Sequence, residues 1–449
     1  MVQKKLPLEN GDHITKEKNG SSFSDPAFSI NKTQPIHRWV PWIAGFSKEF
    51  VSDSIKRYID GNGIILDPFV GVGTTLIESH ITGNNSIGFE INPYAYFACK
   101  TKINSLQIDE DMFNNQITRF SLFYRNKLNS KYRPISKAPG GFKTRVEFYS
   151  PKVLRKVLIF MDFIQTIDDQ NISDLFKLAF TSTMVKYSNY SYEPSLATRS
   201  KSGKSDIEDY DVLEVTTQKL LEFSKDIIWI KKAVSNKDPT PQIFNDSFFN
   251  YKEYLSKKTI DLIITSPPYL NNYHYNRNTR PQIYWLGFAQ SPKDMKPLEE
   301  SNFGNYWQTV RDKEEIDIIF EVPEIDLIDK LDQLKKIHPD KRVYGGSGWA
   351  NYAVSYFNDC YRFSKGIEFT LKKGKTALVV IGNSILQGVE IPTDKYFAKI
   401  AESIGLEIVD IHSPKFKRIG SSIIQSDVRA KKATGGHRLY ESIVELRKL

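Results

Sequence analysis

Short apolar runs alternate with longer amphipathic stretches along this chain. The short runs are rich in Val, Ile and Leu and are bounded by turn residues, which is typical of buried strands. They predict strands at residues 64–67, 86–90, 242–247, 260–264, 376–381, 406–411 and 441–446. The longer stretches have the 3.6-residue period of helices. They predict helices over residues 48–58, 75–82, 112–128, 151–167, 174–187, 212–234, 351–372 and 395–404. This alternation predicts an α/β fold built on a parallel sheet.

The alternation of strands and helices is interrupted twice. Residues 101–240 are mostly helical and predict an insertion into the sheet domain. Residues 289–350 are charged and irregular and predict a second insertion. The sheet domain is therefore expected to be discontinuous, with residues 31–100 and 241–449. Residues 1–30 are polar, and we expect them to form a flexible arm.

One predicted strand ends in a rigid turn, Thr265-Ser266-Pro267-Pro268-Tyr269. Two consecutive prolines cannot continue a central strand, because each lacks an N–H and fixes φ. The chain must leave the sheet at Ser266, at the carboxyl end of the strand, where open α/β sheets bind ligands. The turn offers one hydroxyl, backbone carbonyls and an aromatic ring. The alternative is a surface turn with an incidental tyrosine.

A second turn follows the strand at residues 64–67, in the stretch Asp67-Pro68-Phe69-Val70-Gly71-Val72-Gly73-Thr74-Thr75. Gly71 and Gly73 permit a tight backbone and the close approach of a ligand. Thr74 is expected to cap the next helix, whose N-terminus favours polar or anionic groups. Two such turns on one sheet edge predict a nucleotide-like cofactor on one side and its reaction partner on the other.

Two carboxylates also end predicted strands. Glu90 lies roughly twenty residues beyond the glycine turn, where dinucleotide folds place an acid that accepts ribose hydroxyls. The turn has G-x-G without a third glycine, which fits a nucleoside better than a dinucleotide. Asp246 is a second acceptor, for an exocyclic amine of the cofactor. An ordinary surface acid at Glu90 and a helix cap at Asp246 are the alternatives.

An aromatic segment precedes the glycine turn, at residues 35–51. Proline breaks its first half, and Ser47 is expected to cap the helix that follows. Phe46 is expected either to present a ring to the cofactor or to belong to a packed entry helix.

The loop after Tyr269 mixes aromatic, amide and arginine side chains over residues 270–280. Nucleic-acid surfaces use this mixture, because rings stack, amides read base edges and arginines hold phosphates. Tyr273, Arg277 and Arg280 are the expected nucleic-acid contacts. An interior loop filled by tyrosine packing is the alternative.

Charge and cysteine content narrow the class of protein. The chain has 62 Lys and Arg against 53 Asp and Glu, a net charge of +9, which favours a polyanionic partner. Only two cysteines occur, so we expect no disulfide framework, no cysteine-based zinc site and a reducing, cytoplasmic location. We expect no metal, and no secretory signal at the N-terminus. We also expect no membrane segment, because no apolar run approaches about eighteen residues.

The two turns together resemble the motifs of the amino-group DNA methyltransferases. Asp67 to Thr75 is similar to the glycine motif of that family, and Ser266-Pro267-Pro268-Tyr269 is similar to its catalytic tetrapeptide. The serine form most often marks the cytosine-N4 branch. The resemblance covers residues 35–100, 242–288 and about 351–449. It implies a Rossmann-like methyltransferase fold with a seven-stranded, mostly parallel sheet that has one antiparallel strand near the end.

The resemblance also implies a cofactor and site roles. The methyl donor would be S-adenosyl-L-methionine, with Glu90 at its ribose and Asp246 at its adenine amine. The expected catalytic residues are Ser266, Pro267, Pro268 and Tyr269. The expected cofactor-binding residues are Phe46, Asp67, Pro68, Phe69, Gly71, Gly73, Thr74, Glu90 and Asp246.

The implied activity is transfer of a methyl group to the exocyclic N4 amine of a flipped-out cytosine in double-stranded DNA. Such an enzyme is the modification part of a restriction-modification system, and its partner is a restriction endonuclease of the same specificity. The two insertions are then the expected DNA-reading regions. Adenine-N6 methylation is the main rival, followed by RNA or protein-glutamine methylation and by a non-catalytic nucleic-acid-binding protein. Cytosine-C5 methylation is disfavoured, because Cys99 and Cys360 lie in predicted helices and not in a strand-edge proline turn.

Overall fold

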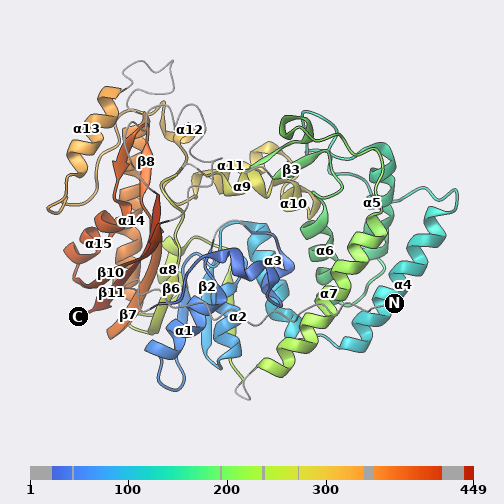
Figure 1. Cartoon of the computed structure of the whole chain (residues 1–449), viewed down its shortest axis with the longest axis horizontal. Helices are drawn as coiled ribbons and strands as arrows, with labels where there is room; N and C mark the ends of the chain where they lie inside the picture. The colour runs from blue at the N-terminus through green and yellow to red at the C-terminus, as the bar shows by residue number, and fades with distance from the viewer. Residues whose placement is uncertain are drawn as a thin grey trace, which may run out of the picture.

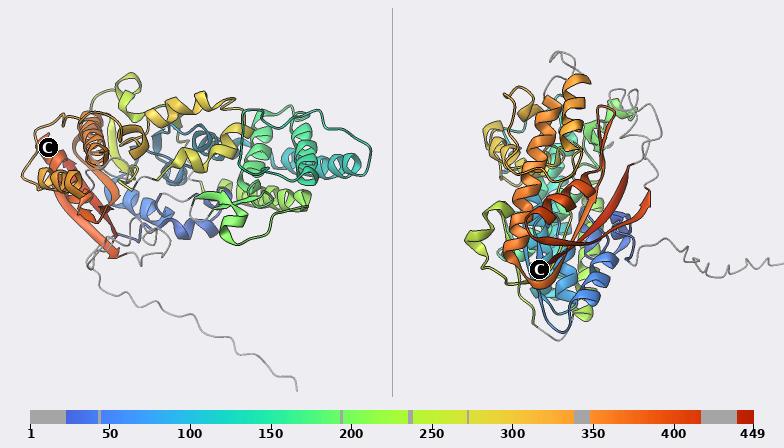
Figure 2. Two further views of the ribbon diagram at one scale, coloured as in Figure 1. Left: turned by 90° about the horizontal axis from the view of Figure 1, so that it is seen from above. Right: turned by 90° about the vertical axis from the view of Figure 1, so that its left-hand side faces the viewer.

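A computed structural model gives the structure of this chain (Figure 1). It describes residues 23–42, 45–192, 195–234, 238–271, 273–337, 348–416 and 439–449. A seven-stranded sheet forms one end of the molecule, and a group of helices forms the other (Figures 1 and 2).

The strand order in the sheet is β10-β11-β7-β6-β1-β2-β5. The strands are β1 (Ile64–Asp67), β2 (Asn85–Phe89), β5 (Pro241–Phe244), β6 (Ile260–Thr265), β7 (Leu371–Gly382), β10 (Leu406–Phe416) and β11 (Tyr440–Lys448). All pairs from β5 to β7 are parallel, and β11 is antiparallel to both of its neighbours. The predicted seven-stranded sheet with one late antiparallel strand is confirmed.

Alternate residues of the strands face two different apolar layers, as the two-residue period of a strand requires. Ile263 faces a core formed with α14 (Gly348–Thr370) and α15 (Thr393–Ser403), whereas Leu262 and Ile264 face α1 (Lys48–Tyr58). Helices α2 (Thr74–Ile81) and α3 (Pro93–Asn104) follow β1 and β2, and the short α8 (Tyr251–Tyr254) leads into β6.

A helical insertion lies between β2 and β5 in the sequence, and its apolar residues share one core with α3, residues 36–40 and residues 283–289. The helices of the insertion are α4 (Glu110–Leu128), α5 (Pro151–Ile164), α6 (Gln170–Thr183) and α7 (Val212–Ala233), and each end lies within four residues of its predicted position. Each begins after an Asp or Ser whose side chain accepts a main-chain N–H, which is the preferred helix start. The sequence did not predict the hairpin β3 (Tyr190–Tyr192) and β4 (Leu196–Thr198).

The block at residues 289–350 is more ordered than its charged sequence predicts. It contains α11 (Pro292–Glu300), α12 (Trp307–Val310) and α13 (Leu327–Ile337), and its apolar residues join the core around α14. Helices α9 (Tyr275–Asn278) and α10 (Arg280–Trp285) lead from β6 toward the helical insertion (Figure 1). A second unpredicted hairpin, β8 (Ser384–Leu386) and β9 (Val389–Ile391), follows β7.

Short 3-10 helices complete the described chain. They are η1 (Phe28–Thr33), η2 (His37–Trp39), η3 (Ser105–Gln107), η4 (Arg199–Ser202) and η5 (Phe248–Asn250). No helix among the described residues is long and apolar enough to cross a membrane.

Two local predictions differ from the structure, and the first of them falls largely outside the described residues. The flexible arm predicted for residues 1–30 does not reach residue 30, because Phe23 packs on Phe50 and η1 begins at Phe28; residues 1–22 lie outside the described residues. Thr74 does not cap α2, because it is the first helical residue and Gly73 holds the cap position in a left-handed conformation.

Candidate active site

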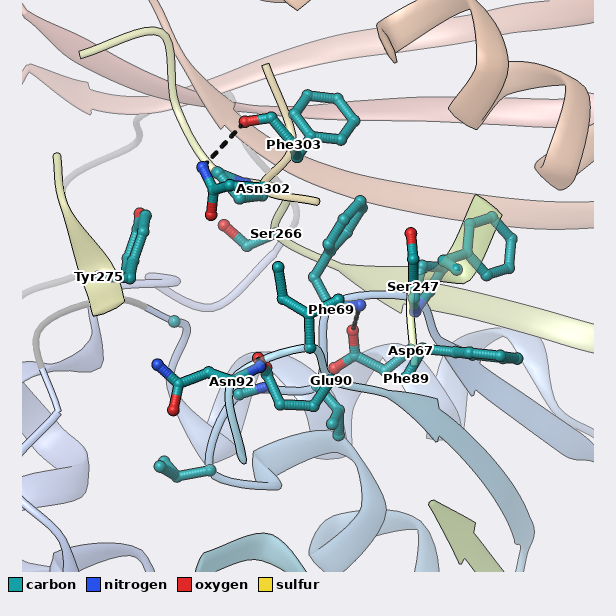
Figure 3. Close-up of a pocket in the computed structure, with 18 of the residues that line it drawn as sticks. Asp67, Phe69, Phe89, Glu90, Asn92, Ser247, Ser266, Tyr275, Asn302 and Phe303 are labelled. Atoms are coloured by element: carbon teal, nitrogen blue, oxygen red, sulfur yellow. Dashed lines mark hydrogen bonds between the residues drawn. The ribbon is translucent and has the colours of Figure 1, made fainter. Parts of the chain in front are cut away.

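A pocket opens at the carboxyl ends of β1, β2, β5 and β6 (Figure 3). It encloses about 970 Å³ of empty space, part of which is open to solvent. Ten of the predicted site residues line it: Phe46, Asp67, Pro68, Phe69, Gly71, Thr74, Glu90, Asp246, Ser266 and Pro268. The structure therefore brings the glycine turn and the Ser-Pro-Pro turn to one cavity.

Asp67 fixes the two turns relative to each other. Its carboxylate is buried and accepts hydrogen bonds from the Thr265 hydroxyl at 2.7 Å, the Thr75 hydroxyl at 2.6 Å and the Phe69 N–H at 3.1 Å. Burial raises the pKa of Asp67 to about 6, although these three donors act in the opposite direction. One side chain thus joins the end of β1 to the end of β6 and to the start of α2.

The two glycines of the first turn have different structural roles. Gly71 lines the pocket, has φ +52°, and donates its N–H to Glu90 Oε2 at 2.9 Å. Gly73 does not line the pocket. A Cβ atom there would lie 2.6 Å from Cys99 Sγ, so a side chain at Gly73 would meet α3 and not a ligand. In this structure, packing against α3 and a φ of +92° are the features that require a glycine at position 73, and the predicted contact with a ligand stays a prediction.

Glu90 directly follows β2 and faces the pocket (Figure 3). In addition to the Gly71 N–H, its carboxylate accepts the Asn92 N–H at 2.7 Å. Burial raises the pKa of Glu90 to about 7, so its proton is lost near neutral pH.

Asp246 lies at the mouth of the pocket, at the end of β5, and is partly exposed. It accepts hydrogen bonds from the Ser247 N–H, the Asn250 amide and the Tyr254 hydroxyl at 2.7, 2.9 and 2.8 Å. Burial opposes ionisation, but these donors outweigh it and lower the pKa of Asp246. The carboxylate stabilises the link into α8 and still lines the cavity.

The Ser-Pro-Pro-Tyr turn divides between the pocket and the sheet. Ser266 and Pro268 line the cavity, whereas Pro267 is buried and is not part of the lining. The Tyr269 hydroxyl lies 3.5 Å from Ser266 Oγ and donates to Glu441 Oε1 at 3.1 Å. Burial and the charge of Glu441 raise the pKa of Tyr269 well above its usual value. Tyr269 is therefore beside Ser266 but outside the described cavity wall.

None of the three predicted DNA contacts lines the cavity. Tyr273 packs edge-on against Tyr275, with ring centroids 4.9 Å apart. Arg277 is exposed on α9. Arg280 donates to the Lys143 carbonyl at 3.1 Å and lies over the rings of Phe142 and Tyr284, so it joins α10 to the helical insertion.

Sequence reasoning missed part of the wall. The lining also contains Tyr275 and Asn276 on α9, and Ser301, Asn302 and Phe303 after α11 (Figure 3). The aromatic and amide character of residues 270–280 was a usable signal for the first pair. Residues 301–303 carry no local signal, because long-range contacts place them: Phe303 packs on Phe69 at 5.3 Å between centroids.

Among the described residues, no group of His, Cys, Asp and Glu is arranged to hold a metal ion. The chemistry of the pocket is that of hydroxyl, amide and carboxylate groups among aromatic rings.

Comparisons with known proteins agree with this geometry. The family model described as DNA methylase matches residues 4–100. The type II methyltransferase M.BsoBI of Geobacillus stearothermophilus is 24% identical over 455 residues, which cover 91% of this chain and 86% of that protein. M.AvaI of a Nostoc species is 24% identical over 415 residues, covering 86% of this chain and 82% of that protein. A solved rRNA methyltransferase, AviRa of Streptomyces viridochromogenes, aligns over 90% of this chain and 87% of that chain, with 7% identity and a TM-score of 0.28.

The sequence resemblance is confirmed by the relatives, and the strand order and the shared pocket of the two turns agree with it. The comparisons therefore support an amino-group DNA methyltransferase of the restriction-modification type, with S-adenosylmethionine as the methyl donor.

Proposed function

We propose that this protein methylates the exocyclic N4 amine of cytosine in double-stranded DNA. The observation that carries the proposal is the position of Ser266. It lines the same cavity as the glycine turn, and it follows β6, the direct neighbour of β1. The turn carries a neutral hydroxyl where the adenine-N6 branch more often carries Asp or Asn.

The lining of the pocket fits S-adenosylmethionine. A carboxylate has roughly four acceptor positions, and main-chain N–H groups occupy two on Glu90. A third main-chain N–H, that of Ile91, also interacts with this carboxylate, and we assign its remaining acceptor capacity to the ribose. We assign the adenine amine to Asp246 and the methionine part to the turn from Asp67 to Gly71. Phe46 and Phe69 supply apolar walls, and Thr74 lies at the start of α2, where unpaired N–H groups favour a carboxylate.

The chemistry assigned to the chain is the activation of a poor nucleophile. The lone pair of a base amine is delocalised into the ring. The Ser266 hydroxyl lines the cavity and would accept a hydrogen bond from the NH₂ group. We assign the second acceptor to the carbonyl of the adjoining Pro267, which is outside the described lining; together the two acceptors favour a pyramidal nitrogen with a localised pair. When bound, S-adenosylmethionine supplies an electrophilic methyl group. Alignment of the amine by the rigid turn then lowers the barrier through proximity.

Base flipping is required, because the target amine is hidden in a duplex. We assign to the Tyr269 ring a stacking contact with the extruded base, worth about 1–3 kcal/mol. Tyr273 precedes α9, the exposed Arg277 lies on α9, and α9 borders the pocket through Tyr275 and Asn276. We assign Arg277 to a DNA phosphate. Arg280 is a weaker assignment, because its guanidinium is already engaged with the helical insertion.

The exposed basic residues Lys143, Arg145 and Lys201 extend this surface across the helical insertion. Their loops are joined to the α9 and α10 region by the Arg280 contact and by a bond from the Tyr192 hydroxyl to the Asn278 carbonyl at 3.0 Å. We propose that a duplex follows this surface, and that a restriction endonuclease of the same specificity is the biological partner.

Nucleoside mass spectrometry of DNA incubated with enzyme and S-adenosylmethionine tests the proposal. N4-methylcytosine is the expected product. N6-methyladenine would replace the cytosine assignment with the adenine one. The absence of any methylated base, together with no thermal stabilisation by S-adenosylmethionine, would reject catalysis altogether.

A further inference from the structure

A strained turn precedes the segment that walls the cofactor pocket. The Pro35 carbonyl accepts the His37 N–H at 2.7 Å across Ile36, which has φ 65° and ψ −45°. These are the features of a γ-turn with positive φ, a rare and strained conformation. For a β-branched residue it is a true outlier, and such strain persists only where surrounding contacts determine it.

Asp226 on α7 supplies those contacts. Its carboxylate is 2% exposed and accepts the Ile36 N–H at 2.9 Å, the Trp39 indole N–H at 2.9 Å, and two guanidinium N–H groups of Arg38 at 3.1 and 2.5 Å. The Trp39 ring also stacks on Phe223 of α7, with centroids 4.2 Å apart. We call Asp226 and its donors on residues 36–39 the Asp226 clamp.

The clamped turn is connected to the pocket on its other side. His37 Nε2 hydrogen bonds Glu78 Oε1 on α2 at 2.9 Å. Trp42, three positions after Trp39, lines the cavity. It also packs closely on the glycine turn, since a Cβ atom built on Gly71 would lie 3.3 Å from the Trp42 indole nitrogen. Gly45 and Phe46 continue the wall. The turn is thus held between a helix of the insertion and the glycine turn of the sheet domain.

We propose that Asp226 is a positioning residue for S-adenosylmethionine. Through the clamp, the helical insertion fixes the course of residues 35–42 and so the wall formed by Trp42 and Phe46. The insertion therefore contributes to the cofactor site as well as to DNA contacts. This inference rests on the assignment of the pocket to S-adenosylmethionine.

The experiment compares the wild-type protein with Asp226→Asn. Calorimetry gives the Kd for S-adenosylmethionine, and steady-state kinetics gives kcat and the KM values for S-adenosylmethionine and for DNA. An amide has one acceptor oxygen, and its NH₂ group would face the Arg38 guanidinium. Displacement of a binding wall weakens contacts with the bound molecule, so the Kd and the KM for S-adenosylmethionine are expected to rise about tenfold, which corresponds to about 1.4 kcal/mol of binding free energy. The kcat and the KM for DNA are expected to stay within about twofold, which general loss of folded enzyme would not produce.

Two further variants make the result decisive. Trp39→Phe keeps an aromatic ring against Phe223 and removes one donor, so it is expected to give a smaller rise and to remain folded. Glu214→Gln changes an exposed acid on the same helix and is expected to behave as wild type. The inference is overturned if folded Asp226→Asn and Trp39→Phe both bind S-adenosylmethionine as wild type does, or if both substrates' KM values rise equally. If the wild-type protein itself does not bind S-adenosylmethionine, the proposed function fails instead.

Discussion

Replacing Gly73 by alanine tests the finding that this glycine serves helix packing. Two costs are expected. A non-glycine residue at φ +92° costs about 1–2 kcal/mol. The new methyl group would also lie 2.6 Å from the sulfur of Cys99, which is fully buried, and overpacking of this kind costs about 1–3 kcal/mol. The sum is a loss of about 2–5 kcal/mol in the free energy of unfolding.

Gly61→Ala is the matched control. Gly61 has φ +83°, but a Cβ atom there would meet no atom within 4 Å. Gly61→Ala should therefore lose only the backbone contribution of about 1–2 kcal/mol in the free energy of unfolding. The difference between the losses of the two variants then measures the overlap with Cys99. Combining Gly73→Ala with Cys99→Ala should relieve the overlap and give a coupling energy of about 1–3 kcal/mol.

Urea unfolding followed by circular dichroism gives these free energies, and calorimetry gives the Kd for S-adenosylmethionine of the folded variants. We expect large effects on stability and small ones on Kd. Equal stability of Gly73→Ala and Gly61→Ala, or no coupling with Cys99, would refute the packing argument. A Gly73→Ala protein of normal stability that no longer binds S-adenosylmethionine would restore the direct-contact explanation.

Three other outcomes are expected. Ser266→Ala should lower kcat at least about a hundredfold with the Kd for S-adenosylmethionine unchanged, since removal of a transition-state hydrogen bond costs about 3 kcal/mol; full activity would exclude Ser266 from catalysis. The folded-state pKa of Glu90 is raised to about 7, so its ionised form is lost as pH falls through 7; S-adenosylmethionine binding should weaken between pH 8 and 6, and Glu90→Gln should bind weakly with that pH dependence gone. Phe303→Ala should lower the free energy of unfolding by about 3–5 kcal/mol, because the ring is 4% exposed and packs on Phe69, and unchanged thermal stability would contradict this.

The sheet was predictable because its strands are short, apolar runs that end in recognisable turns. The helices of the insertion were predictable for a similar reason, because each has an apolar period and begins after an Asp or Ser that caps it. The hairpins β3–β4 and β8–β9 were missed, because strands of three residues carry too few positions to show a two-residue period.

In the candidate site, the predicted residues at the ends of strands do line one cavity. Residues that reach the cavity only through contacts with distant parts of the chain were not predicted. Nothing near Phe303 in the sequence indicates that it will reach Phe69. Gly73 shows a related limit, because a glycine required by a neighbouring helix and one required by a ligand look the same in sequence.

The Asp226 clamp has a consequence for engineering new target specificity. The insertion at residues 101–240, which we propose to contact DNA, enters at the edge of the sheet, between β2 and the edge strand β5, so a different insertion would disturb few sheet contacts. Yet α7 carries the carboxylate that holds residues 36–39. A chimera that exchanges the insertion alone would therefore lose part of its cofactor wall, and a graft should carry residues 35–46 of the donor enzyme with it.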